Sequence, residues 1–234
     1  MIVVSTVLAG FVAGKVIDFE TSQWVVYAGV GCLQVALYAS QLLFLFYRDP
    51  ERISPNAPHG ILSPADGKII YIKNVQSNTV PRSEKASKKM VLDEITRSSL
   101  CHRNMCQIGI SMVFTDVHVN RAPIAGKVSL LAHRPGKFLS LRHAESVDLN
   151  ERQTIVIENE RVQVGVIQIA SRLVRRIEAY VQEGNSVAMG QRIGMIRFGS
   201  QVDVIMPVDV LASVDVTIGQ TVVAGETLIA RTLH

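Results

Sequence analysis

The Gly199-Ser200 step, near the C-terminal end of the chain, has residue types suited to breaking its own peptide bond. It lies between two apolar, strand-like runs within residues 194–204. Glycine tolerates strained backbone angles, so a fold that bends this bond lets the Ser200 hydroxyl attack the Gly199 carbonyl. After this N→O acyl shift, β-elimination and hydrolysis yield a pyruvoyl group, a built-in ketone that serves as an electron sink for amines. By itself, Phe-Gly-Ser more often marks a turn.

Two other positions carry side chains that acid–base chemistry uses. Asp66 precedes a glycine, and Asp-Gly is a strong hairpin-turn signal, so turn formation alone accounts for this residue. His118 follows a strand-like stretch at 107–115 and lies close to Asp116. It is either an oriented base or a histidine satisfied within the core.

The composition describes a folded protein with an uneven charge. The chain has 234 residues, 48% apolar and 19% charged, enough for one domain with an appendage or two small domains. From Gln201 onward four acidic residues face one arginine, a net charge of −3; the total is +4, so residues 1–200 carry +7. A basic body suits an anionic membrane surface. Nucleic acid is a poorer partner, because the few aromatics are not interleaved with basic residues.

The cysteines give no sign of a disulfide framework or a metal site. Three irregularly spaced cysteines indicate a reducing compartment. Cys101-His102 and Cys106 fit no standard zinc spacing, so incidental thiols are the simpler interpretation. We therefore expect no metal.

The N-terminal region predicts a membrane anchor. Residues 24–46 hold no charged residue, and a helix of that length reaches about 34 Å, enough to span a bilayer. Residues 1–14 reach only about 21 Å and lack the basic start and A-x-A site of a signal peptide. We predict a hydrophobic hairpin or monotopic anchor at 1–47. Arg48 and Arg52 favour a cytoplasmic position for the rest of the chain; a buried soluble helix is the alternative.

The remainder, residues 48–234, has the pattern of a β-rich domain. Strand-like alternation is strongest through residues 126–170, and the polar stretch 81–104 is expected to be a surface loop. The pattern G-x-x-V-x-x-G-x-x-[IL] occurs twice, at 184–193 and 219–228. It resembles the paired hammerhead turns of biotinyl/lipoyl-like β-sandwiches (the barrel-sandwich hybrid). A carrier domain of that type needs a lysine between its repeats, and the last lysine here is Lys137.

Six ordered segments together resemble the short, bacterial/archaeal kind of phosphatidylserine decarboxylase proenzyme. They are FYRDPER at 46–52, SPADGKI at 63–69, DVHVNRAP at 116–123, PGKF at 135–138, NER at 150–152 and RFGS at 197–200. The resemblance covers nearly the whole chain. It implies a pyruvoyl-dependent membrane enzyme, needing neither pyridoxal phosphate nor metal, that turns a serine-headgroup phospholipid into the ethanolamine phospholipid.

The resemblance also implies roles for individual residues. Self-cleavage leaves a β chain, 1–199, associated with an α chain, 200–234; Gly199 ends the former and Ser200 supplies the pyruvoyl group. Asp66 and His118 assist as the acid–base pair. Arg121 stays protonated near neutral pH, so it is a possible contact for the substrate phosphate or carboxylate. We expect the enzyme at the cell membrane, peripheral or hairpin-anchored, with its catalytic domain in the cytoplasm.

Two departures from the family pattern leave alternatives open. Gln201 stands where the short kind often has arginine, and His118 stands alone where longer relatives have two histidines. The sequence leaves open whether this one histidine serves both self-cleavage and decarboxylation. The alternatives are the same chemistry on an archaeal-type ether lipid, or an inactive membrane-anchored relative that keeps the fold.

Overall fold

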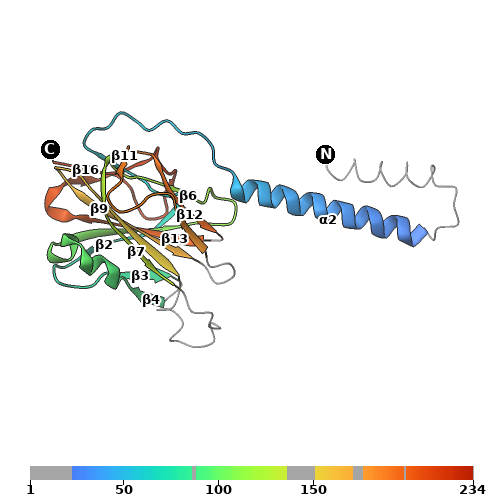
Figure 1. Cartoon of the computed structure of the whole chain (residues 1–234), viewed down its shortest axis with the longest axis horizontal. Coiled ribbons are helices and arrows are strands. Elements are labelled where there is room, and N and C mark those ends of the chain that lie inside the picture. Colours follow the sequence, from blue (N-terminus) through green and yellow to red (C-terminus); the bar gives the residue numbers. More distant parts are fainter. Residues whose placement is uncertain (1–22, 86–87, 136–150, 171–175, 198, 234) are drawn as a thin grey trace. The chain divides into compact units, whose positions relative to one another are not determined.

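The structure is a computed structural model that describes residues 23–85, 88–135, 151–170, 176–197 and 199–233. The chain divides into two compact units, Met1–Arg48 and Asp49–His234 (Figure 1). The first predicted apolar segment, residues 1–14, lies outside the described residues.

The described part of the first unit is the helix α2, Gln23–Tyr47. Its stretch Val25–Tyr47 is long and apolar enough to cross a membrane. Apolar side chains such as Val35 and Phe44 are exposed along it, whereas a core helix of a soluble protein buries at least one apolar face. The predicted N-terminal apolar helix is confirmed.

The second unit is built from short antiparallel strands, as predicted. The strands are β1 (Gly60–Leu62), β2 (Gly67–Val75), β3 (Arg82–Lys85), β4 (Lys88–Val91), β5 (Met105–Ser111), β6 (Val119–Arg121), β7 (Gly126–Arg134), β8 (Arg152–Glu158), β9 (Gln163–Ala170), β10 (Arg176–Ala179), β11 (Ser186–Val187), β12 (Arg192–Arg197), β13 (Gly199–Pro207), β14 (Leu211–Val214), β15 (Thr221–Val222) and β16 (Leu228–Thr232). Three 3₁₀ turns accompany them: η1 (Asp93–Arg97), η2 (Ser99–His102) and η4 (Val208–Val210).

The strand order reveals two halves with the same connectivity. The largest sheet has the order β11-β7-β8-β9-β13-β5-β2-β15, and two three-stranded sheets have the orders β10-β12-β6 and β14-β16-β1. Each strand of residues 119–197 therefore has a counterpart in the other half, and β9 and β13 meet at the centre. Matching hydrogen bonds join the halves: Leu62 N to Pro123 O and Arg121 N to Pro64 O, both 2.9 Å. The half at 119–197 is inserted between β5 and β13 of the other.

The repeated glycine motif forms the matching turns of the two halves. Gly184 and Gly219 have φ of +91° and +92°, and Gly190 and Gly225 have +75° and +73°. These values lie in the left-handed region that glycine enters without a Cβ clash. Each motif then leads into the central strand of its small sheet, β12 or β16. The prediction of glycine turns is confirmed at all four positions.

The central strand β13 separates two packing layers. Its Val202, Val204 and Met206 side chains belong to the main core, whereas Ile205 belongs to a second cluster on the opposite face. This is the alternation that a strand buried on both faces produces.

The second layer corrects the expectation of a surface loop at 81–104. This segment forms the β3–β4 hairpin and the η1 and η2 turns, which lie on the lower side of the sheet in Figure 1. Leu92, Ile95 and Leu100 are fully buried in the second cluster. Arg152, 1% exposed on β8, donates to Glu94 at 2.8 and 2.9 Å and fastens the segment to the sheet. Although its composition is polar, the segment 81–104 covers the second face of the sheet with these buried apolar side chains.

Candidate active site

The Gly199–Ser200 bond lies where the central strand loses its regular pairing. Against β9, Gly199 opposes Ala170 and Gln201 opposes Ile169, so the register shifts by one residue at Ser200. Against β5, pairing begins only at Gln201, opposite Ser111. A bulge of this kind twists a strand locally, re-aims a side chain and is common beside active sites. The backbone irregularity coincides with the bond that the sequence singled out.

His118 lies beside the strand that leads to this bond. Its carbonyl accepts a hydrogen bond from Ile196 N at 3.1 Å, three residues before Gly199. The imidazole is fully buried, and its Nδ1 lies 2.8 Å from the carbonyl oxygen of Asp116. A carbonyl only accepts, so Nδ1 carries the proton and Nε2 of the neutral ring is the basic nitrogen. The backbone carbonyl of Asp116 orients the Nδ1 side of this histidine.

Asp66 is bound to the segment after the helix. Both of its carboxylate oxygens accept from Arg52, at 2.5 and 2.8 Å, and one also accepts from Ala224 N at 2.8 Å. Its side chain is only 13% exposed. These bonds tie the turn before β2 to the glycine turn after β15, and the role of Asp66 in catalysis stays a prediction.

Arg121 is held in the same region. Its guanidinium donates to Gly190 O at 3.1 Å and Pro50 O at 2.9 Å, and lies 3.3 Å from Asp49. A Cβ on Gly225 would come within 2.8 Å of its side chain. Arg121 therefore clamps the two repeated turns to the chain entering the β domain, and contact with substrate stays a prediction.

The three predicted residues make their contacts in neighbouring parts of the β domain. Asp66 and Arg121 meet at adjacent residues of one glycine turn, Ala224 and Gly225. His118 lies three residues from Arg121 at the other end of β6, beside the strand that reaches Gly199.

A buried polar network on β13 is a feature that the sequence did not reveal. Asp203, three residues after Ser200, is fully buried. Its oxygens accept three hydrogen bonds of 2.8 to 2.9 Å, from Tyr71 Oη, Gln107 Nε2 and Gln201 Nε2. Gln201 Nε2 also contacts Ser83 Oγ on the β3–β4 hairpin at 2.7 Å. We call these five residues the Asp203 network; it joins the strand after the cleavage bond to its neighbours and to the covering hairpin.

Burial dominates the electrostatics of this network. Loss of water raises the pKa of Asp203, although the donors around it favour the carboxylate. Burial and the neighbouring Asp203 charge also raise the pKa of Tyr71, so its hydroxyl keeps its proton and remains a donor. Gln201, which departs from the family pattern, is a central member of this network.

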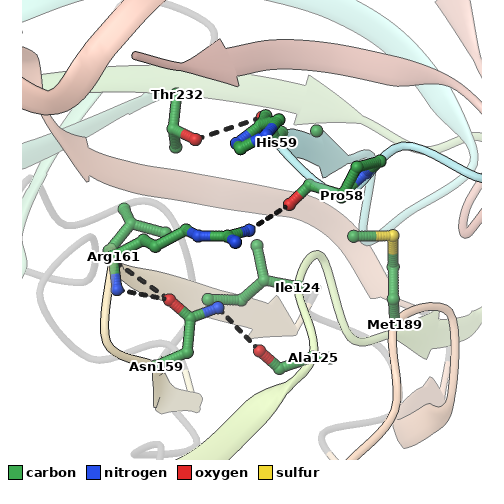
Figure 2. A pocket seen from close by; sticks show the side chains of 10 residues that line it. Pro58, His59, Ile124, Ala125, Asn159, Arg161, Met189 and Thr232 are labelled. Carbon is green, nitrogen blue, oxygen red and sulfur yellow. Dashed lines mark hydrogen bonds between the residues drawn. The ribbon is translucent and has the colours of Figure 1, made fainter. Parts of the chain in front are cut away.

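Figure 2 shows a cavity at the other end of β9 from the Gly199–Ser200 bond. It is a cavity of about 180 Å³ near Pro58, Asn159, Arg161 and Thr232. Arg161 donates to Pro58 O at 2.9 Å and Asn159 to Ala125 O at 2.8 Å, so these side chains hold loops together. The cavity borders the turn before β9, and Ala170 ends that strand about 23 Å away. We do not assign the active site there.

Metal ligands are not gathered within the described ranges, where no group of three His, Cys, Asp or Glu residues could hold an ion. Cys101 and Cys106 are free and buried.

Comparison with known proteins identifies the family. Residues 39–230 match the family model described as phosphatidylserine decarboxylase. A phosphatidylserine decarboxylase proenzyme of Erythrobacter litoralis (strain HTCC2594) is 44% identical over 163 residues. The match covers 69% of this chain and 62%, less than two thirds, of that relative. No solved structure matches significantly. The chain belongs to the phosphatidylserine decarboxylase family.

Proposed function

We propose that this protein is a self-processing, pyruvoyl-dependent enzyme that decarboxylates a serine-headgroup phospholipid to the ethanolamine phospholipid. The observation that carries the proposal is the register shift at Ser200, on the central strand of a chain of this family. A bond released from regular pairing can bend more readily than one within a regular ladder.

Self-cleavage uses the residues around this bond. The Ser200 hydroxyl adds to the Gly199 carbonyl, the C–N bond breaks, and an ester joins the two residues. Elimination releases the chain 1–199 as a carboxylate, and hydrolysis of the remaining dehydroalanine releases ammonia and leaves the pyruvoyl group. We assign to His118 Nε2 the removal of the serine proton, because Nδ1 is committed to the Asp116 carbonyl. Asp66 assists by holding the chain around the site.

The pyruvoyl ketone would bind the substrate amine and accept the electron pair released as the carboxylate leaves. The residues of the chain bind the substrate, orient it and return a proton to it. We also assign to His118 the return of a proton to the substrate Cα, since its carbonyl accepts a hydrogen bond from Ile196 on β12, the strand that precedes Gly199. The Asp203 network fixes Gln201, which becomes the second residue of the new chain. Arg121 stays a possible contact for the substrate phosphate.

The proposal also includes a membrane anchor and a finer fold class. α2 anchors the protein to the cell membrane, with Arg48 and Arg52 favouring a cytoplasmic β domain. We also infer a barrel-sandwich arrangement of the biotinyl/lipoyl type. The matching halves and their paired glycine turns support this class.

Intact mass under denaturing conditions tests the proposal. Purified wild-type protein should give two species, residues 1–199 and a fragment of residues 200–234 whose N-terminus is blocked. Ser200→Ala should stay one chain and release no CO₂ from the serine lipid. Ser213→Ala, which alters a half-buried serine on β14 within the same fragment, should cleave normally. An uncut wild-type chain with full decarboxylase activity would refute the mechanism.

A further inference from the structure

The turn Val113–Asp116 exposes apolar side chains at its tip. Val113 is 59% exposed and Phe114 40% exposed. Asp116 N donates to Val113 O at 3.0 Å, which closes the turn around Phe114 and Thr115. Gly, Pro, Asn, Asp and Ser dominate such positions, and an aromatic residue has no conformational advantage there. The apolar tip therefore calls for a reason other than turn geometry.

This tip is joined at both ends to the candidate active site. Ser111, at its N-terminal side, pairs with Gln201, the residue after Ser200. His118 follows at its C-terminal side. The chain between them is short, so the tip cannot move far from the cleavage bond.

The turn is also held firmly. The Asp116 carboxylate accepts a hydrogen bond from Val113 N at 2.7 Å, while the Asp116 carbonyl accepts from His118. Met112 and Val117, which flank the exposed residues, are buried in the β domain. The tip is thus a fixed projection, and binding through it costs little ordering of the chain.

We propose that the Val113–Asp116 turn inserts its apolar tip into the lipid surface and holds the active site against the headgroups. The proposal rests on the proposed function, in which the substrate is a membrane lipid. Apolar side chains beside a cationic one favour an anionic bilayer surface. The exposed Lys68 lies opposite Ser111 in the β2–β5 ladder and supplies that charge. The anchor α2 keeps the domain near such a surface.

Fluorescence quenching in reconstituted vesicles tests the contact without requiring turnover. Trp24 is the single tryptophan, so Trp24→Phe provides a dark background for Phe114→Trp. In vesicles of phosphatidylcholine and phosphatidylserine, brominated lipid should quench this tryptophan by about half or more. Leu233→Trp is the matched control: Leu233 is 54% exposed and follows Thr232, which lines the cavity in Figure 2 far from Ser200. Equal quenching at the two positions, or none at 114, would overturn the proposal, as would quenching that requires another protein.

Kinetics separate surface contact from catalysis. For the double variant Val113→Ser and Phe114→Ser, kcat/KM on vesicle-bound serine lipid should fall at least about tenfold, or about 1.4 kcal/mol. On a monomeric short-chain serine phospholipid it should stay within about twofold of wild type, and cleavage by mass should be complete. Equal loss on both substrates would overturn the proposal. Failure of the proposed function appears differently, as an uncut wild-type chain.

Discussion

Replacing Asp203 by alanine tests whether the Asp203 network holds the central strand. The substitution removes three accepted hydrogen bonds, from Tyr71, Gln107 and Gln201. Each donor keeps another partner, such as Ser83 Oγ for Gln201, so we assign about 1 kcal/mol to each lost bond. The expected loss is then about 3 kcal/mol in the free energy of unfolding.

The measurement is thermal unfolding in a Ser200→Ala background, because self-cleavage would otherwise change the chain during the experiment. For a domain of this size, a loss of about 3 kcal/mol lowers Tm by roughly 6 to 12 °C. Asp209→Ala is the control: Asp209 is exposed and paired with Arg103, so its loss should cost at most about 1 kcal/mol. If the two variants melt within about 2 °C of each other, the network does not stabilise the strand.

Four other perturbations have outcomes that the structure specifies. Burial raises the pKa of Asp203, so the folded state holds the Asp203 proton more tightly than the unfolded state does. The stability that this proton contributes is lost as pH rises from about 4 through the folded pKa. In denaturant titrations, the stability of Ser200→Ala relative to the double variant Ser200→Ala and Asp203→Asn should therefore fall between pH 4 and 7, and a constant difference would contradict the raised pKa. With Ser200 intact, His118→Ala should slow cleavage by about 10²-fold or more, measured by mass over time; wild-type cleavage would make His118 a structural residue. Gly190→Ala should destabilise more than Gly184→Ala in urea titrations, since both have positive φ but a Cβ on Gly190 collides with Ser54 while that on Gly184 meets open space; equal losses would argue against the close packing. Deleting residues 1–48 should release the β domain from membranes in a flotation assay, and persistent flotation would assign the anchor elsewhere.

The sequence predicted the parts of the fold that local chemistry determines. Gly184 and Gly225 could be assigned to turns because few other residues adopt their backbone angles. The long uncharged run of α2 could be recognised from its composition. The chemistry of Gly199 and Ser200 singled out the peptide bond between them as the candidate for cleavage, and the structure adds a register shift at that bond.

The features that the sequence missed depend on contacts between distant segments. Gln201 and Asp203 alternate with valines on β13, a pattern typical of a strand with one face in water. That face is covered by the β3–β4 hairpin, whose polar composition suggested a surface loop. Because the cover was not recognised, the burial of Asp203 could not be inferred. Nor could local pattern show that Asp66 binds Arg52, since a turn aspartate looks the same whatever it contacts.

The insertion of one half of the fold within the other bears on when cleavage can occur. The polypeptide crosses between the halves twice, once through residues 112–118 and once from β12 into β13, and Gly199–Ser200 is the first peptide bond of β13. Strand β13 pairs with β5 and β9, β15 with β2, and β16 with β1, so β1, β2 and β5 each wait for a partner synthesised after the bond. The register shift at Ser200 forms only when β13 has paired with β9 and β5. Under the proposed function, processing would then act as a check on assembly: a chain that ends before β13 is complete would stay uncut, and each processed molecule would carry a cut that records the pairing of its central strand.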